Sequence, residues 1–205
     1  MIAIMDYGVG NIFSLYSSLK YIGADACLTK NPDDLKKADK LILPGVGAFA
    51  DAALKLETSG LKDALINEVK NGKPLLGICL GMQLLFETSY EYGVHKGLGL
   101  IKGDIMPIAD DISKKLKIPH IGWNKLEFTQ KGYKSEIFKN INSGDFVYFV
   151  HSYYAKNCTE SVTATCEYGA CLTASVQNNN VYGTQFHPEK SGKTGLKILE
   201  AFSQL

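Results

Sequence analysis

Short apolar segments alternate with helix-like segments through the first half of the chain, and this alternation constrains the fold most strongly. The apolar segments cover residues 2–5, 24–28, 40–43 and 74–78. Each has the length of a strand, and apolar side chains recur at helical spacing between them. Strands and helices in this order form βαβ units, in which parallel strands carry helices on both faces. The first half therefore predicts an α/β fold with a mostly parallel central sheet.

Helix-start signals lie between these strands. Asn11 precedes apolar residues at helical spacing, and we expect its side chain to cap that helix. Asn31 followed by Pro32 is typical of a second helix start. We also expect one helical stretch over 48–70, another helix beginning over 81–86, and a final helix over 193–204.

The second half changes to short strands separated by Gly, Asn and Ser turns. The clearest strands cover residues 146–150, 162–166, 170–176 and 181–186. Such strands predict an antiparallel extension of the parallel sheet. No repeat, linker or low-complexity segment interrupts the chain, so we expect a single domain over residues 1–205.

Composition places the chain among ordinary globular proteins. Hydrophobic residues make up 45% and charged residues 21%, and the formal net charge is +1. This charge gives no reason to expect nucleic acid or an acidic membrane surface as a partner. The short basic cluster at 114–117 is expected to be a solvated face. The first apolar run is too short for a signal sequence, and no stretch is long enough to span a bilayer, so we expect a cytoplasmic protein.

Cys79 lies where an apolar strand meets a helix, in Gly77-Ile78-Cys79-Leu80-Gly81. This is the small-x-nucleophile-x-small pattern of a nucleophile elbow, in which larger residues two positions away would clash. The following helix directs its N–H groups at the sulfur and favours thiolate. The Leu80 N–H would then face an oxyanion. The alternative is a buried structural cysteine.

The other four cysteines, Cys27, Cys158, Cys166 and Cys171, lack these surroundings. They follow no zinc spacing, and we expect them to be structural. The sequence therefore predicts no metal site.

His187 is the histidine best placed to act as the base for Cys79. It follows a predicted strand, and Glu189 two residues later can orient one ring nitrogen while the other faces the thiol. Of the other histidines, His95 is expected to be structural, whereas either His120 or His151 could line a site.

A second glycine-rich turn, Pro44-Gly45-Val46-Gly47, follows the third strand. It lacks the Lys-Ser/Thr of a phosphate-binding P-loop. Because parallel strands place their C-terminal loops side by side, Val46 or Gly47 could supply a second oxyanion N–H. The alternative is a plain tight turn.

Taken together, these motifs resemble the class-I (triad-type) glutamine amidotransferases, which implies a flavodoxin-like core. More narrowly, the chain resembles the glutaminase subunit of imidazole glycerol phosphate synthase, a histidine-biosynthesis enzyme. The narrower resemblance rests on segments spread over nearly the whole chain, which include Asp6-Tyr7-Gly8-Val9-Gly10-Asn11, Pro44-Gly45-Val46-Gly47-Ala48-Phe49, Gly81-Met82-Gln83-Leu84-Leu85-Phe86, Gly97-Leu98-Gly99-Leu100, His120-Ile121-Gly122-Trp123-Asn124, Phe149-Val150-His151-Ser152-Tyr153 and His187-Pro188-Glu189-Lys190-Ser191.

The resemblance implies a role for each matching residue. Cys79 would be the nucleophile, His187 the base and then the acid, and Glu189 the orienting carboxylate. Binding of the glutamine α-carboxylate and α-amino groups would fall to Gln83, Ser152 and Tyr153, with Glu91. No metal or organic cofactor is implied.

The resemblance also implies a partner, a (β/α)₈-barrel cyclase that receives the ammonia in a heterodimer. The products would be imidazole glycerol phosphate and an aminoimidazole carboxamide ribotide. Positions at or near the family's docking face correspond to Asn11, Trp123, Tyr148 and Lys190. Phe13 departs from the pattern, because many members carry a basic or polar residue there, and the change bears on partner contacts or allosteric coupling.

Three alternatives are weaker. A glutaminase subunit could serve another synthase, such as one for surface-sugar amidation. Subunits that feed guanylate, anthranilate or carbamoyl phosphate synthesis usually carry His-Gln where this chain has Met82-Gln83, which argues against those three. A non-catalytic regulatory subunit commonly loses one triad residue, and all three are present here. A cysteine protease or hydrolase is not favoured by Gln83 or the His-Pro-Glu segment.

Overall fold

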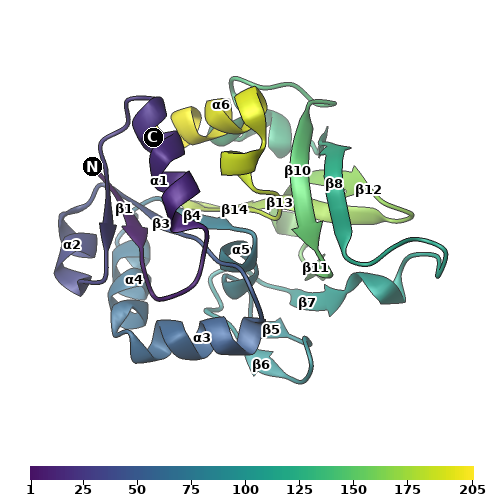
Figure 1. Cartoon of the computed structure of the whole chain (residues 1–205), viewed down its shortest axis with the longest axis horizontal. Coiled ribbons are helices and arrows are strands. Elements are labelled where there is room, and N and C mark those ends of the chain that lie inside the picture. The colour runs from purple at the N-terminus through teal and green to yellow at the C-terminus, as the bar shows by residue number, and fades with distance from the viewer.

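The computed structural model describes residues 1–205 and has an eight-stranded sheet at its centre (Figure 1). The strand order is β2-β1-β3-β4-β14-β13-β12-β9. Neighbours from β2 to β14 are parallel, and those from β14 to β9 are antiparallel. The predicted mostly parallel sheet with an antiparallel extension is confirmed. The strands are β1 (Ile2–Met5), β2 (Ala26–Thr29), β3 (Lys40–Leu43), β4 (Leu75–Ile78), β9 (Glu127–Phe128), β12 (Val162–Glu167), β13 (Cys171–Asn178) and β14 (Val181–Thr184).

Helices cover both faces of this sheet. Successive side chains of a strand point to opposite faces, so a strand that is apolar throughout needs a core on each side. Ile2 and Ile4 of β1 share a core with α1 (Ile12–Tyr21) and α6 (Gly192–Ser203). Ala3 and Met5 of the same strand share the opposite core with α2 (Pro32–Lys37), α3 (Phe49–Thr58) and α4 (Leu61–Lys70). Figure 1 shows these two helix layers above and below the sheet.

Two smaller sheets complete the second half. One joins β11 (Tyr153–Lys156), β7 (Asp104–Pro107), β5 (Thr88–Ser89) and β6 (His95–Lys96). The other, which we call the β8–β10 ribbon, pairs β8 (His120–Lys125) with β10 (Phe146–His151) antiparallel. The strand predicted over 146–150 therefore exists, but it lies outside the main sheet.

The prediction of one helical stretch over 48–70 was wrong. The structure has two helices there, α3 (Phe49–Thr58) and α4 (Leu61–Lys70). Gly60 separates them with a φ of +73°, which glycine adopts without strain and which ends the helical geometry.

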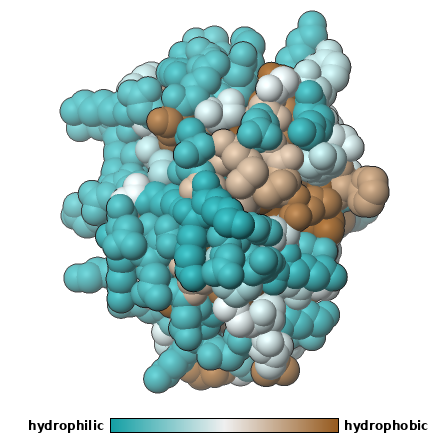
Figure 2. All heavy atoms as spheres, turned by 90° about the vertical axis from the view of Figure 1, so that its left-hand side faces the viewer, coloured by the Kyte–Doolittle hydropathy of each residue, from teal (hydrophilic) through white to brown (hydrophobic).

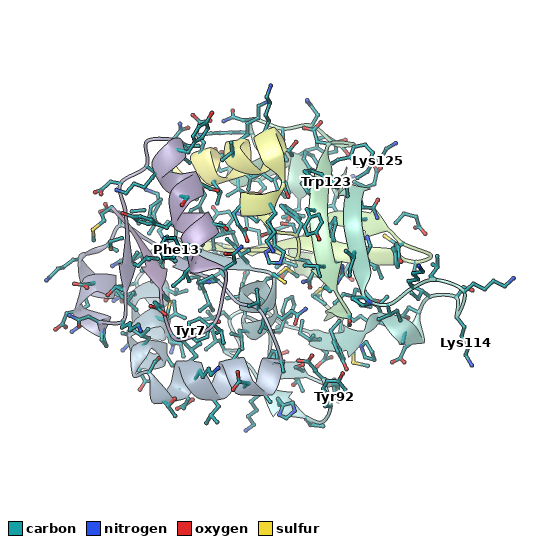
Figure 3. The ribbon with its side chains drawn as sticks, viewed as in Figure 1. Tyr7, Phe13, Tyr92, Lys114, Trp123 and Lys125 are labelled. Atoms are coloured by element: carbon teal, nitrogen blue, oxygen red, sulfur yellow. The ribbon has the colours of Figure 1, made fainter.

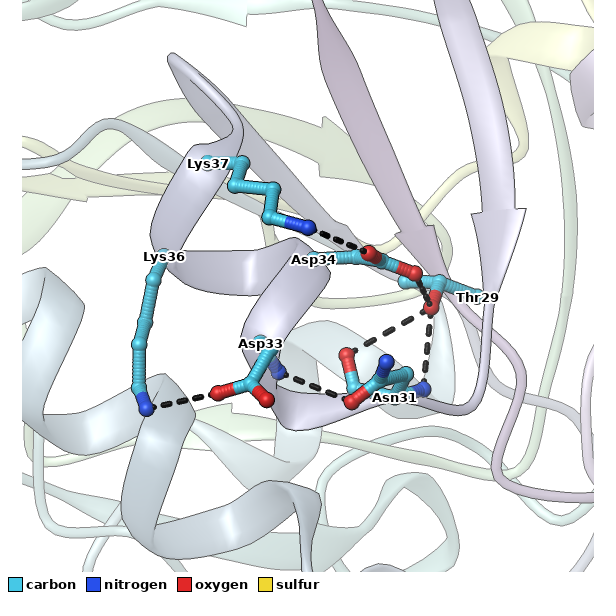
Figure 4. Close-up of polar contacts among 6 residues, drawn as sticks. All are labelled: Thr29, Asn31, Asp33, Asp34, Lys36 and Lys37. Atoms are coloured by element: carbon cyan, nitrogen blue, oxygen red, sulfur yellow. Dashed lines mark hydrogen bonds and ion pairs between the residues drawn. The ribbon is translucent and has the colours of Figure 1, made fainter.

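The two predicted asparagine caps had different outcomes. The Asn11 side chain makes no capping hydrogen bond to α1, so that prediction was wrong. The Asn31 side chain accepts from the Asp33 N–H at 3.0 Å at the start of α2 (Pro32–Lys37), as predicted (Figure 4). Thr29 adds a bond of 2.7 Å to Asp34 and fixes the entry into this helix.

β14 was predicted as part of the antiparallel extension, and this was wrong for one of its two edges. It pairs antiparallel with β13 but parallel with β4, where Thr184 lies opposite Ile78. The strand is buried on both faces, as a central parallel strand must be. Its C-terminal end therefore lies beside that of β4, where Cys79 follows.

The outer surface is largely polar where β2 and α2 form the edge of the molecule (Figure 2). Lys114 is exposed and points away from the fold, as expected of a solvated basic cluster (Figure 3). None of the helices has both the length and the apolar character needed to cross a membrane.

Candidate active site

Cys79 connects β4 to α5 (Leu80–Leu84) with a positive φ of 55°. Such a backbone is unfavourable for a residue with a Cβ and persists only where its surroundings enforce it. Here the Cys79 N–H donates to Thr184 O at 2.7 Å, and Cys79 O accepts from the Gln83 N–H at 3.1 Å. The turn is therefore held by both the neighbouring strand and the following helix.

Three glycines allow the close approach that this turn requires. A Cβ on Gly81 would overlap the Leu43 carbonyl oxygen, and one on Gly77 would lie 2.8 Å from Gly81 O. Gly45 of the second turn would place a Cβ 2.7 Å from the Gly81 nitrogen. The two turns interlock because β3 and β4 are neighbours. The structure thus agrees with the expected elbow and places the second turn beside it.

His187 and Glu189 form a buried pair. The His187 Nδ1 lies 2.8 Å from Glu189 Oε1, and the two side chains are 2% and 3% exposed. Burial alone would lower the pKa of His187, but its polar contacts with Cys79 and Glu189, and then their charges, outweigh burial and raise that pKa to about 9. The His187 Nε2 has no hydrogen-bond partner in the chain. The site therefore favours the protonated form of His187, which can donate a proton to a leaving group.

Cys79 and His187 line one pocket with a volume of about 270 Å³. A pocket of this size suits a small molecule. Every residue predicted to form the oxyanion site or to bind substrate also lines it, whereas Glu189 contacts the ring of His187. The remaining lining residues are Val46, Gly47, Leu80, Gln83, Glu91, Pro119, Val150, His151, Ser152 and Tyr153.

The predicted oxyanion donors are available. The backbone N–H groups of Val46, Gly47 and Leu80 donate no hydrogen bond within the chain. Gly47 has a φ of +100°, so its backbone adopts a conformation that favours glycine. Free donors around a nucleophile are what an oxyanion requires.

Gln83 and Glu91 each retain an unused oxygen on the pocket lining. The Gln83 Nε2 donates to Tyr153 O at 3.1 Å and to Gln185 Oε1 at 3.0 Å, which leaves its Oε1 as an acceptor. Glu91 Oε2 accepts from the Phe49 N–H at the start of α3, and its other oxygen makes no bond in the chain. Two free acceptors suit an ammonium group.

Sequence reasoning missed Gln185 and Tyr7. The Gln185 Nε2 lies 3.7 Å from Cys79 Sγ, and the Tyr7 hydroxyl donates to Pro44 O at 2.6 Å in the second turn. Burial and then the Cys79 charge raise the pKa of Tyr7. The sequence held no signal for Gln185, because it lay inside the strand predicted over 181–186 and its contact with Cys79 depends on the parallel pairing of β14 with β4.

The other cysteines differ from Cys79. Burial raises the pKa of Cys158 to about 11 and that of Cys166 to about 12, which fits their predicted structural role. Cys171 is exposed, so it does not pack in the core, and all five cysteines are free. No group of three or more His, Cys, Asp or Glu side chains is arranged to hold a metal ion.

Of the predicted docking residues, Trp123 and Tyr148 lie opposite each other in the β8–β10 ribbon, with ring centroids 6.2 Å apart. Trp123 is 54% exposed. Lys190 ends a short 3-10 turn after His187 and is exposed, and Asn11 precedes α1, which contacts that turn. Figure 3 shows Trp123 on the ribbon and the exposed Phe13 on α1.

Known proteins with similar sequences agree on one family. A sequence model described as "Glutamine amidotransferase class-I" matches residues 3–204. The chain is 48% identical to the imidazole glycerol phosphate synthase subunit HisH of Bacillus licheniformis, over 100% of this chain and 96% of that protein. It is 47% identical to the subunit of the same name from Caldanaerobacter subterraneus, over 100% and 98% of the two chains.

Solved structures share the fold at lower identity. PurLQS from Thermotoga maritima matches with a TM-score of 0.77 at 19% identity, over 98% of this chain and 96% of that one. A structure described as a glutamine amidotransferase matches with a TM-score of 0.76 at 19% identity, over 100% and 99% of the two chains.

Proposed function

The chain belongs to the class-I glutamine amidotransferases, and we propose that it is the glutaminase subunit of an imidazole glycerol phosphate synthase in histidine biosynthesis. One observation supports this most strongly. Cys79, held in a strained turn, shares a pocket with His187, whose Nδ1 is hydrogen-bonded to Glu189 and whose Nε2 is free.

In the first half of the proposed reaction, the Cys79 thiolate attacks the side-chain amide carbon of glutamine. The carbonyl oxygen gains negative charge and is met by the Leu80 N–H and by Val46 or Gly47. His187 donates its Nε2 proton to the leaving nitrogen, and the C–N bond breaks. Ammonia and a glutamyl thioester result.

In the second half, water attacks the thioester carbon while the now neutral His187 accepts a proton from it. The C–S bond breaks, which regenerates the thiolate and the imidazolium and releases glutamate. Gln83 and Glu91 accept from the substrate's α-ammonium group through their free oxygens, and the backbone of Ser152 and Tyr153 receives the α-carboxylate.

The proposed partner is a (β/α)₈-barrel cyclase that takes up the ammonia. Aromatic residues are common at the centre of stable interfaces and polar residues at their rim, and Trp123 and Tyr148 with the exposed Lys190 provide this chemistry. A cytoplasmic location and a heterodimer remain predictions of the same proposal.

The experiment compares glutamate release by the chain alone with release by the chain mixed with the cyclase from the same source and its phosphoribulosyl nucleotide. We expect slow hydrolysis by the chain alone, a large increase in the mixture, and formation of imidazole glycerol phosphate. Glutamate release without any stimulation or cyclised product would contradict the proposal and favour another synthase, for example one that amidates surface sugars.

A further inference from the structure

Two buried histidines lie directly behind the glutamine-binding side of the pocket. His120 and His151 face each other across the β8–β10 ribbon and are 3% and 6% exposed. The His120 Nδ1 lies 3.1 Å from the His151 Nε2, and the His151 Nδ1 lies 2.9 Å from Tyr153 O. His151 lines the pocket, whereas His120 does not. Neither ring has a role in the reaction proposed above.

The hydrogen-bond partners determine which nitrogen of each histidine donates and which accepts. A carbonyl oxygen only accepts, so the His151 Nδ1 carries the proton and its Nε2 accepts. The His120 Nδ1 must then donate, and the His120 Nε2 accepts from the Asn124 Nδ2 at 3.4 Å. Burial lowers the pKa of His120 to about 4 and that of His151 to about 3, so each ring is neutral near pH 7 and holds one proton.

This series of hydrogen bonds leads to residues proposed to bind the substrate. Tyr153 O accepts from both His151 and the Gln83 Nε2. The Gln83 amide can bind Tyr153 O and Gln185 Oε1 only in the orientation that leaves its own oxygen free. The opposite tautomer of His151 would aim a lone pair at Tyr153 O and repel that carbonyl.

We propose that His120 and His151 are positioning residues of the glutamine site. Asn124 and His120 select the tautomer of His151, which holds the Tyr153 carbonyl and thereby the Gln83 amide that receives the substrate's ammonium group. This proposal rests on the proposed function, because it assigns the two rings a role in binding glutamine.

Two substitutions of His120 separate hydrogen bonding from packing. His120 stacks on Phe149 and Tyr168, with ring centroids 4.9 and 4.1 Å away. His120→Phe keeps an aromatic ring and removes the donor, whereas His120→Asn removes the ring and keeps a donor near the position of Nδ1. In the complex with the cyclase, we expect His120→Phe to raise KM for glutamine about tenfold and change kcat less than about threefold. We expect His120→Asn to keep KM within about threefold of the parent.

A KM unchanged in His120→Phe, or raised equally in both variants, would overturn the proposal, since either result assigns His120 to packing. An unmodified protein offers a test that does not depend on folding of a variant. Long-range ¹H–¹⁵N spectra of histidine-labelled protein should show both rings protonated at Nδ1 and bare at Nε2. Protonation of either ring at Nε2 would overturn the proposed positioning role of His120 and His151. Absence of glutaminase activity in the parent complex would instead contradict the proposed function.

Discussion

Among single residues, Glu189 is the carboxylate hydrogen-bonded to the ring of His187, and both side chains are buried. We expect Glu189→Gln to lower kcat for glutamine hydrolysis by about 10² to 10⁴, since the imidazolium loses its counter-charge and its orientation. Steady-state kinetics of the complex measure this loss. Glu200→Gln, a partly exposed acid on α6, is the matched control and should be neutral. A parent-like kcat in Glu189→Gln would remove Glu189 from the triad.

The sequence was sufficient for the His187–Glu189 contact because the two residues are only two positions apart. It was not sufficient for Gln185, which reaches Cys79 across 106 positions only because β14 pairs parallel with β4. The His120–His151 contact likewise depends on the register of the β8–β10 ribbon. Local motifs predict local contacts, whereas contacts between distant segments require the strand pairing.

At the scale of elements, the interlocked turns after β3 and β4 are the least tolerant part of the fold. A Cβ at Gly81 would overlap the Leu43 carbonyl, which is backbone and cannot rotate away. We expect Gly81→Ala to lower the free energy of unfolding by about 3 kcal/mol or more, measured by denaturant titration. Gly60→Ala is the control, because a Cβ there meets nothing within 4 Å and only the positive φ is unfavourable. It should lose about 1 kcal/mol. Equal losses in the two variants would show that the close approach does not matter.

Strand predictions succeeded where apolar runs were bounded by turn residues. For β1 and β3, the observed first and last residues are the predicted ones. The helix prediction over 48–70 failed because the periodic pattern continues across Gly60, and only the left-handed backbone there separates α3 from α4. The Asn11 cap failed because Asn11 has a φ of −85° and a ψ of 62°, outside the extended backbone typical of a capping residue. Both failures concern local backbone angles, which residue types alone do not determine.

At the scale of the whole molecule, we expect the two neutral histidines to make the fold sensitive to acid. Their folded pKa values, about 4 for His120 and about 3 for His151, lie below the ordinary value of 6.5. The unfolded chain therefore binds more protons below pH 6.5, so stability is fully present above that pH and is lost as pH falls towards 4. We expect the free energy of unfolding to fall by about 2 kcal/mol per pH unit between pH 6 and 4.5. In His120→Asn the slope over this interval should be about half as steep; an unchanged slope would mean that these rings are not the cause.

The proposed association with a cyclase is a second property to test at the scale of the whole molecule. We expect Trp123→Ala to weaken binding of the cyclase by about tenfold or more, because an exposed aromatic at an interface centre carries a large share of the binding energy. Tyr21→Ala is the control, since Tyr21 is 80% exposed and lies at the far end of α1 from Asn11. Isothermal titration of each variant with the cyclase gives the two affinities. Similar losses for both variants would place the docking face elsewhere.

In the proposed function, Cys79 releases ammonia from glutamine and the cyclase partner uses it. The most direct test measures cyclised product from the complex carrying Cys79→Ala, once with glutamine and once with an ammonium salt. We expect glutamine-dependent turnover to fall by about a thousandfold or more and ammonium-dependent turnover to stay within about twofold of the parent. Glutamate release by the variant at the parent rate, or equal loss of both activities, would rule out Cys79 as the source of the ammonia.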